Sequence, residues 1–178
     1  MKTKIAIIGG GASGLAAACA LGENAEVTLY EHTDRVGKKI LQTGAGRCNV
    51  MNASMAPERF ICDDMNAAKK ILCGSGDRIK DFFEKLGLVL HEEDEGRIYP
   101  LTNQAASVLD VLRFNAVESG VEIIVGAQIK GIVKKGKEYA VRDEVNGTRL
   151  YDKIILACGG KLLLKQARTG PAFCLPLL

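Results

Sequence analysis

The sequence has no tryptophan, only two histidines, little excess charge and no long hydrophobic run, and each shortage excludes a class of protein. A net charge of +3 over 178 residues is too small to indicate a partner such as a nucleic acid or an anionic membrane. No run reaches the roughly 18 apolar residues that a membrane-spanning helix needs. Because the cysteines form no C-x-x-C pair and both histidines stand alone, the sequence predicts no metal site.

The six cysteines are interpreted as scattered, buried thiols in a reducing compartment rather than as three disulfides. The basic start and the apolar residues up to position 21 resemble a signal peptide. However, Gly9, Gly10, Gly11 and Gly14 interrupt the apolar segment and disfavour a continuous helix there. We therefore expect a cytoplasmic protein.

The first 31 residues follow the order strand, glycine turn, helix, strand. Residues 4–8 form an apolar run typical of a strand buried on both faces, and residues 15–21 are an alanine-rich stretch with high helix propensity. Residues 26–30 predict a second strand that ends at Glu31. The sequence thus predicts a βαβ unit with a G-x-G-x-x-G turn after its first strand.

Each glycine of that turn has a role in binding a dinucleotide. Gly9 makes the tight turn, Gly11 lets a pyrophosphate approach the backbone, and Gly14 lets the helix lie close to the strand. The N-terminus of the helix offers N–H groups to phosphates, and Ser13 adds a hydroxyl donor. The pattern predicts dinucleotide binding, and the alternative is a structural turn in another α/β protein.

Glu31 lies at the end of the second strand, where a carboxylate can accept both ribose hydroxyls of an adenosine. The same negative charge would repel a 2′-phosphate. NAD and FAD share this fingerprint, so residues 1–31 leave the choice between them open.

Residues 35–49 form a basic loop punctuated by glycines. Its lysines and arginine can meet phosphates, and its glycines permit a close approach of the backbone to a ligand. A solvated basic loop explains the same residues equally well. The residues concerned are Lys38, Lys39, Gly44, Gly46 and Arg47.

Three motifs resemble those of the BaiN/YhiN-type flavoproteins over residues 1–161. They are the glycine turn, the run 37–49 that ends in Thr-Gly-Ala-Gly-Arg-Cys-Asn, and the segment Gly-Arg-Ile-Tyr-Pro at 96–100 with Gln-Ala-Ala-Ser-Val at 104–108. One position departs from the family pattern, because Met51 stands where the family has threonine.

The resemblance implies an FAD-dependent oxidoreductase that uses NAD(P)H. It also implies that the backbone near Ile129 approaches the adenine. The glycines that end the strand at 153–158 suit a backbone that runs against a ligand. The residues expected at the cofactor are Gly9, Gly11, Ala12, Ser13, Gly14, Glu31, His32, Lys38, Lys39, Thr43, Gly44, Gly46, Arg47, Cys48, Asn49, Ile129, Ala157 and Gly159.

The middle of the chain predicts two helices and then strands. Amphipathic periodicity predicts helices over 78–86 and 104–117, and the acidic segment 91–95, which contains His91, is interpreted as a solvated loop. A strand over 121–125 precedes a three-strand meander with an Asn-Gly turn at 146–147. The predicted fold is α/β, a Rossmann-like three-layer fold with a β-meander crossover, incomplete at its C-terminus. The meander strands are 128–133, 138–145 and 148–151, followed by a core strand at 153–158.

Residues 162–178 differ from the rest, because they contain two basic residues, no acidic residue and no periodicity. When the codons available for residues 161–169 are read one base earlier, they permit every residue that the family has after Gly-Gly-Lys. We expect residues 1–161 to be the FAD-binding, N-terminal part of a longer flavoprotein and residues 162–178 to be a frameshifted tail. The alternative is a genuinely divergent tail.

The expected function is transfer of hydride from NAD(P)H through flavin to a small organic substrate. The alternatives are an NAD-dependent dehydrogenase and a nucleotide-binding fragment without activity. A flavin-dependent RNA-modifying role is disfavoured, because residues 1–160 carry balanced charge. No residue is assigned as catalytic, since neither Cys48 nor Cys158 has a partner thiol at short spacing. The residues do not indicate the substrate or the oligomeric state.

Overall fold

The computed structural model describes residues 1–61 and 63–159. The segment interpreted as a frameshifted tail therefore lies outside the described residues. The chain divides into two compact units: Met1–Lys38 with the residues from Leu112 onward, and Lys39–Val111.

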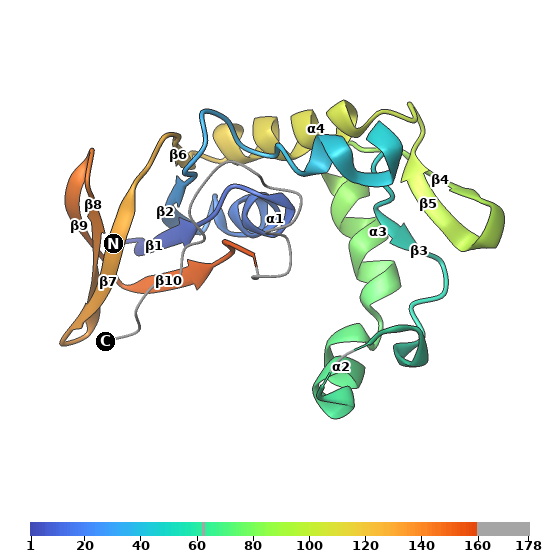
Figure 1. Cartoon of the computed structure of the whole chain (residues 1–178), viewed down its shortest axis with the longest axis horizontal. Coiled ribbons are helices and arrows are strands. Elements are labelled where there is room, and N and C mark those ends of the chain that lie inside the picture. Colours follow the sequence, from blue (N-terminus) through green and yellow to red (C-terminus); the bar gives the residue numbers. More distant parts are fainter. Residues whose placement is uncertain (62, 160–178) are drawn as a thin grey trace. The chain divides into compact units, whose positions relative to one another are not determined.

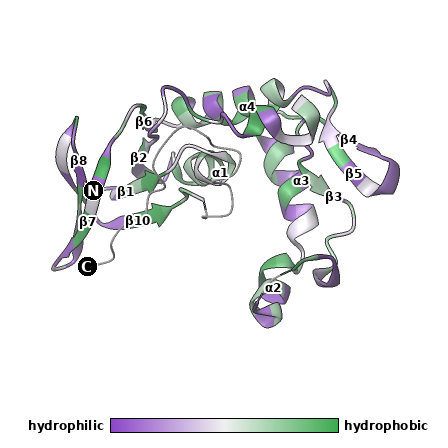
Figure 2. Ribbon diagram, in the orientation of Figure 1, coloured by the Kyte–Doolittle hydropathy of each residue, from purple (hydrophilic) through white to green (hydrophobic). Residues whose placement is uncertain are grey.

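The first unit is built on a parallel sheet of four strands in the order β10-β1-β2-β6. Ala6 and Ile7 of its central strand have no exposed surface, as expected for an apolar run covered on both faces. Figure 2 shows the hydrophobic colouring that marks β10. The strands are β1 (Thr3–Ile8), β2 (Ala25–Tyr30), β6 (Glu122–Ile124) and β10 (Lys153–Leu156).

A helical layer covers one face of this sheet. The helix α1 (Ala12–Leu21) packs on β1 and β2. The C-terminal half of α4 (Ala105–Glu118) packs on α1, where the Cys19 thiol donates to the Leu112 carbonyl at 3.1 Å. The helix α1 begins three residues earlier than predicted, directly after the extended residue Gly11.

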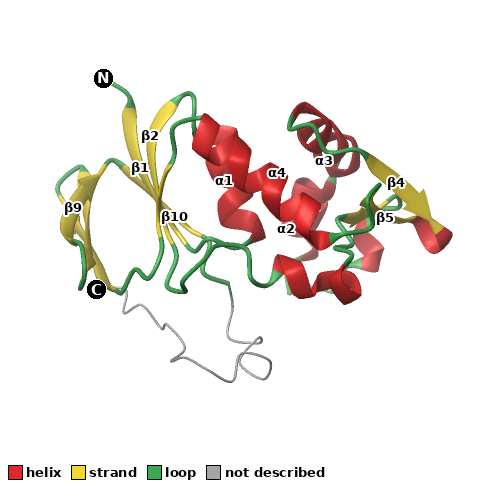
Figure 3. Cartoon of the chain, turned by 90° about the horizontal axis from the view of Figure 1, so that it is seen from above, coloured by secondary structure: helices red, strands yellow, loops and turns green. Residues whose placement is uncertain are grey.

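An antiparallel meander covers the other face, as the views from two directions show (Figures 1 and 3). Its side chains form a core with those of the sheet, in which the hydroxyls of Tyr30 and Tyr151 lie 2.7 Å apart. Burial raises the pKa of Tyr30 above its ordinary value. The predicted three-layer fold with a meander is confirmed. The meander strands are β7 (Ile129–Lys135), β8 (Glu138–Asp143) and β9 (Gly147–Tyr151).

The second unit contains a small antiparallel sheet in the order β3-β5-β4. The predicted helix at 78–86 is present as α3, which begins at Ser75. No pattern in the sequence indicated α2, β3 or the short helices η2 and η3. The elements are η1 (Ile40–Gly46), β3 (Met51–Asn52), η2 (Pro57–Arg59), α2 (Met65–Leu72), α3 (Ser75–Lys85), β4 (Leu90–Glu93), η3 (Asp94–Gly96), β5 (Arg97–Pro100) and the N-terminal half of α4.

The prediction of a loop at 91–95 was wrong for residues 91–93, which lie in β4, whereas Asp94 and Glu95 are exposed in the turn η3 between β4 and β5. His91 lies opposite Tyr99 and Glu93 lies opposite Arg97 in the hairpin formed by β4 and β5. Pairing across the strands gives these polar side chains neighbours. Sequence periodicity does not show this, because three of the four residues of β4 are polar or charged and no apolar alternation is present.

Four cysteines lie in the described residues, and all four are free thiols. Cys48 is buried, but Cys73 and Cys158 are exposed, so the expectation of buried thiols was wrong for these two. In the described ranges, no helix is both long enough and apolar enough to cross a membrane. Likewise, residues 1–61 and 63–159 hold no group of three His, Cys, Asp or Glu side chains placed to bind a metal ion.

Candidate functional site

The glycine turn between β1 and α1 is packed so tightly that a side chain on Gly9 or Gly14 would collide with backbone atoms. Gly9 has φ +114°, and a Cβ on it would lie 2.5 Å from the Ala157 carbonyl oxygen. A Cβ on Gly14 would lie 1.8 Å from the Gly9 carbonyl oxygen. Both glycines are thus required by contacts within the chain, which agrees with the tight turn and the close helix expected for them.

Gly11 differs from these neighbours. Its backbone is extended, with φ −80° and ψ −168°, a conformation open to any residue. A Cβ placed on it would meet no atom within 4 Å. Since no contact within the chain requires glycine here, the open space at the start of α1 suits a group that comes from outside. The exposed residues Ala12 and Ser13 border this space at the first turn of the helix.

Glu31 anchors the end of β2 to the glycine turn. Its side chain is nearly buried, and Oε2 accepts a hydrogen bond from the Gly10 N–H at 2.8 Å. Oε1 accepts from both the N–H and the hydroxyl of Thr33, each at 2.9 Å, and lies 2.9 Å from Nδ1 of His32. Because each carboxylate oxygen has two lone pairs, Glu31 keeps capacity for a further donor.

The start of the meander lies beside Glu31. The Ala127 N–H donates to the Glu31 carbonyl at 2.9 Å, so the backbone before Ile129 runs next to the end of β2. The Ile129 side chain itself belongs to the core. The buried carboxylate of Asp143 holds this backbone by accepting from the Gln128 N–H at 2.8 Å.

The ionisation of Asp143 depends on two opposing effects. Burial opposes its charged form, but the hydrogen bonds that it accepts from Asn146, Gln128 and Val145 outweigh burial and lower its pKa. Asp143 is therefore a carboxylate that holds the turn of the meander in place.

Lys38 ends the N-terminal segment of the first unit and forms an ion pair with Asp34, which lowers the pKa of Asp34. The preceding Gly37 N–H donates to the Gly10 carbonyl at 2.8 Å, so the chain at residues 37–38 lies beside the glycine turn. On the opposite side of the turn, β10 is followed by Ala157 and by Gly159, which has φ +78°.

In the second unit, the loop 43–49 contains four residues with positive φ: Gly44, Ala45, Gly46 and Cys48. A Cβ on Gly44 would lie 2.8 Å from the Asn49 nitrogen, so the loop folds tightly on itself. Positive φ is strained for Ala45 and Cys48, which are not glycines.

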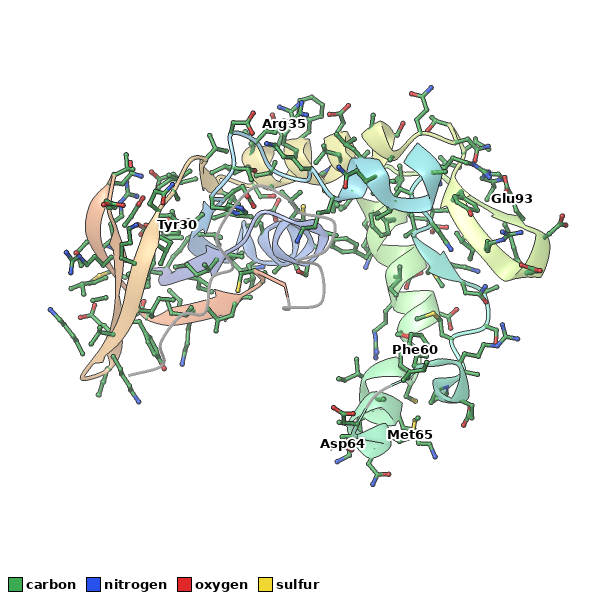
Figure 4. All side chains as sticks on the ribbon, in the orientation of Figure 1. Tyr30, Arg35, Phe60, Asp64, Met65 and Glu93 are labelled. Carbon is green, nitrogen blue, oxygen red and sulfur yellow. The ribbon has the colours of Figure 1, made fainter. Side chains whose placement is uncertain are left out.

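Arg47 points its guanidinium to partners in the same unit. It stacks 4.1 Å from the centre of the Tyr99 ring, and its Nε donates to Asn103 Oδ1 at 3.0 Å. A second nitrogen forms an ion pair with Glu93, which lies on β4 (Figure 4), and the hydrogen bond from Arg47 lowers the pKa of Glu93. Sequence reasoning missed Glu93 and Asn103 as neighbours of this loop, and only Tyr99 lay in a motif already noted.

The expected cofactor residues divide between the units. The first unit brings most of its set together around the β1–α1 turn and the neighbouring ends of β2 and β10, and the second unit holds its set within one loop and the residue before η1. The first set is Gly9, Gly11, Ala12, Ser13, Gly14, Glu31, His32, Lys38, Ile129, Ala157 and Gly159; the second is Lys39, Thr43, Gly44, Gly46, Arg47, Cys48 and Asn49.

The family model of the HI0933-like protein Rossmann domain matches residues 3–173. A curated relative, the 3-dehydro-bile acid delta(4,6)-reductase of Clostridium scindens, is 37% identical over 97% of this chain and 42% of its own length. The ribosomal RNA dihydrouridine synthase of Haemophilus influenzae is 28% identical over 86% of this chain and 39% of its own length. The chain therefore spans about two fifths of the length of these relatives.

Solved structures share the fold at low identity. A flavocytochrome c3 fumarate reductase in its open conformation matches with a TM-score of 0.64 and 20% identity over 93% of this chain and 35% of that one. The 3-ketosteroid-delta4-(5alpha)-dehydrogenase of Rhodococcus jostii matches with a TM-score of 0.63 and 12% identity over 87% of this chain and 45% of that one. These matches confirm the α/β fold.

Proposed function

The chain belongs to the HI0933-like Rossmann domain family, and from that premise we propose that it is the FAD-binding, N-terminal part of a flavin-dependent oxidoreductase. The observation that carries the proposal is Gly11, whose missing side chain serves no contact within the chain. A glycine at the open N-terminus of a helix lets a pyrophosphate reach the backbone.

The first unit would hold the ADP half of FAD. The N–H groups at the start of α1 would bind the pyrophosphate, with Ser13 as a further donor. Glu31, already anchored by Gly10 and Thr33, would accept a ribose hydroxyl with the remaining lone pair of Oε2. The backbone at 127–129 would lie along the adenine, and its position depends on Asp143.

The loop 43–49, together with Lys38 and Lys39, would lie along the pyrophosphate and the flavin. FAD, when bound, supplies the transfer of hydride from NAD(P)H to an organic substrate. This chain provides binding and orientation, and no side chain is assigned to proton transfer.

The proposed substrate is a small molecule with a reducible carbon–carbon double bond. The support is the 37% identical relative, whose name describes a delta(4,6)-reductase of 3-dehydro-bile acids. Ribosomal RNA is the second candidate, because two relatives at 28% and 26% identity are named ribosomal RNA dihydrouridine synthases. The balance of charge over residues 1–160 favours the small molecule.

The test of cofactor binding is Gly11→Ala, measured by titration with FAD followed through the visible absorption bands. We expect the affinity for FAD to fall about tenfold or more, with no loss of folding stability, because the added methyl fills space that the ligand needs. Gly131→Ala is the matched control, since a Cβ there also meets nothing within 4 Å, but it lies on β7.

Three outcomes would contradict the proposal. Equal FAD affinity in wild type and Gly11→Ala would remove its main support. Tight binding of NAD without FAD would favour an NAD-dependent dehydrogenase. No binding of either would leave a fragment without a working site.

The choice of substrate needs the full-length protein. We expect NADH or NADPH oxidation to increase with a steroid-like enone and not with unmodified ribosomal RNA, and the reverse result would favour the second candidate. A reducing, cytoplasmic location is also proposed, in agreement with the free thiols of Cys73 and Cys158.

A frameshift beyond Lys161 remains a proposal as well. Sequencing the coding DNA tests it, and a neighbouring frame that does not restore the family motif would exclude it. The family match itself extends to residue 173.

A further inference from the structure

Arg47 lies in the loop proposed to serve the cofactor, yet its guanidinium is already engaged. It contacts three residues from three places in the second unit: Glu93 on β4, Tyr99 on β5 and Asn103 before α4. Glu93 pairs with the charge of the guanidinium, the Tyr99 ring lies against its flat face, and Asn103 accepts from its Nε–H. Nε and Nη2 of the guanidinium thus have partners within the second unit, and these partners set its orientation.

The loop that carries Arg47 needs an external restraint. Ala45 and Cys48 have φ values of 54° and 61°, in the left-handed region that is strained for a residue other than glycine. Within the loop, the Cys48 N–H donates to the Thr43 carbonyl at 3.0 Å and the Arg47 N–H to the Gly44 carbonyl at 3.1 Å. Just beyond the loop, the Val50 N–H donates to the Ile98 carbonyl on β5 at 2.9 Å.

The partners of Arg47 are themselves connected. His91 Nε2 lies 3.4 Å from Asn103 Oδ1 and 3.6 Å from Glu93 Oε1, so the acceptors of Arg47 also have a second neighbour on β4. Asn103 adopts φ 55°, and its N–H donates to the Pro100 carbonyl at 2.8 Å. The side chains that receive Arg47 are therefore held in place by the hairpin and the turn that follows it.

From these contacts we propose that Arg47 is a positioning residue: it clamps the strained loop 43–49 onto the β4–β5 hairpin and does not bind the cofactor phosphates. Glu93 is its essential partner. The part of the inference that concerns the cofactor rests on the proposed function, whereas the clamp itself does not.

Cys48 provides a local measurement of the clamp, because it adjoins Arg47 and only 8% of the surface of the residue is exposed. The alkylation rate of each cysteine with iodoacetamide is measured in the full chain by peptide mass spectrometry, with exposed Cys73 as the internal reference. We expect Arg47→Gln and Glu93→Gln each to raise the rate at Cys48 about tenfold, since each removes a charged hydrogen bond. The double variant should gain little more, because both changes break one interaction.

Arg149→Gln is the matched control. Arg149 lies on β9 in the first unit and forms an ion pair with Glu122 at 2.6 Å, so its removal breaks a charged pair without touching the clamp residues. Its removal should leave the alkylation rate at Cys48 unchanged. A rise at Cys73 as well as Cys48 would indicate general unfolding and would count against the clamp.

The affinity for FAD separates a clamp from a phosphate ligand. If Arg47 bound phosphate, Glu93→Gln would remove a nearby negative charge and would leave FAD binding equal or stronger. A clamp predicts the opposite: Glu93→Gln weakens FAD binding about as much as Arg47→Gln, and the visible band of the flavin moves toward that of free FAD in both variants. An unchanged rate at Cys48 in both variants would overturn the inference even if FAD binds. If wild type binds no FAD, the proposed function fails, but the alkylation result still decides on the clamp.

Discussion

The glycine turn at 9–14 and the loop at 43–49 are both rich in glycine, but different forces hold them. In the turn, the backbone of one segment lies directly against the backbone of another, so that Gly9 and Gly14 have no room for a methyl group. In the loop, backbone hydrogen bonds and a close backbone approach at Gly44 are joined by side-chain contacts that Arg47 makes with residues far along the chain. A close backbone contact requires a glycine at one position, so the sequence can indicate it. A side-chain contact depends on residues far along the chain, so the sequence does not indicate it.

The strongest test of this difference is Gly14→Ala. Alanine would favour the helix by about 1 kcal/mol. However, its Cβ would lie 1.8 Å from the Gly9 carbonyl oxygen, and neither backbone can move without displacing β1. We expect the free energy of unfolding in urea to fall by about 3 kcal/mol or more. With Gly131→Ala as the neutral control, a loss below about 1 kcal/mol would show that the turn is not held by backbone packing.

The second test is Gly44→Ala in the loop. The added Cβ would lie 2.8 Å from the Asn49 nitrogen at φ +54°, so both contact and strain oppose it. We expect a loss of about 2 kcal/mol in the unfolding free energy. Gly46→Ala is the control for strain alone, because φ is +85° but the nearest atom is 3.9 Å away, and it should cost about 1 kcal/mol. Equal losses in the two variants would mean that contact adds nothing.

The third test is Ala45→Gly, for which we expect the stability to rise. Ala45 is exposed and has φ 54°, so glycine would relieve strain without losing packing. Because glycine also increases the entropy of the unfolded chain, we expect a net gain of only about 0.5 kcal/mol. A loss of stability on Ala45→Gly, measured by thermal unfolding, would show that the loop is not strained at this residue.

The smallest expected change is the response of the loop to acid. The hydrogen bond from Arg47 lowers the pKa of Glu93 below its ordinary value of 4.5. The ion pair is therefore fully present above that ordinary value and is lost as the pH falls through the lower value in the folded protein. We expect the reactivity of Cys48 toward dithiodipyridine, relative to Cys73, to rise only in this acid range. In the Glu93→Gln variant, Cys48 should show the higher reactivity at every pH. A wild-type reactivity of Cys48 that does not change with pH would contradict the role of Glu93.

Much of the first unit could be predicted because its signals are local. The run at residues 4–8, the glycine turn and the Asn-Gly turn at 146–147 each indicate their structure within a few residues, and β1, α1 and the β8–β9 hairpin appear where expected. The second unit was harder to predict. Its β4–β5 hairpin carries charged residues on short strands, so that His91 and Glu93 suggested a loop.

The candidate site shows the same division. Gly9, Gly11, Gly14 and Glu31 could be chosen from spacing alone, because a strand, a turn and a helix in this order place them together. The partners of Arg47 could not be chosen in this way. Glu93 and Asn103 lie 46 and 56 residues away from it along the chain, and no pattern joins them.

The sequence by itself therefore determined the βαβ unit, the meander and the glycines of the turn, since hydrophobic periodicity and conformational freedom are properties of neighbouring residues. Only the tertiary structure decided which glycines are required by contacts within the chain and which one faces open space. It also decided that the charge of Arg47 is held by Glu93. Both depend on distances between segments remote in the chain, and such distances exist only after folding.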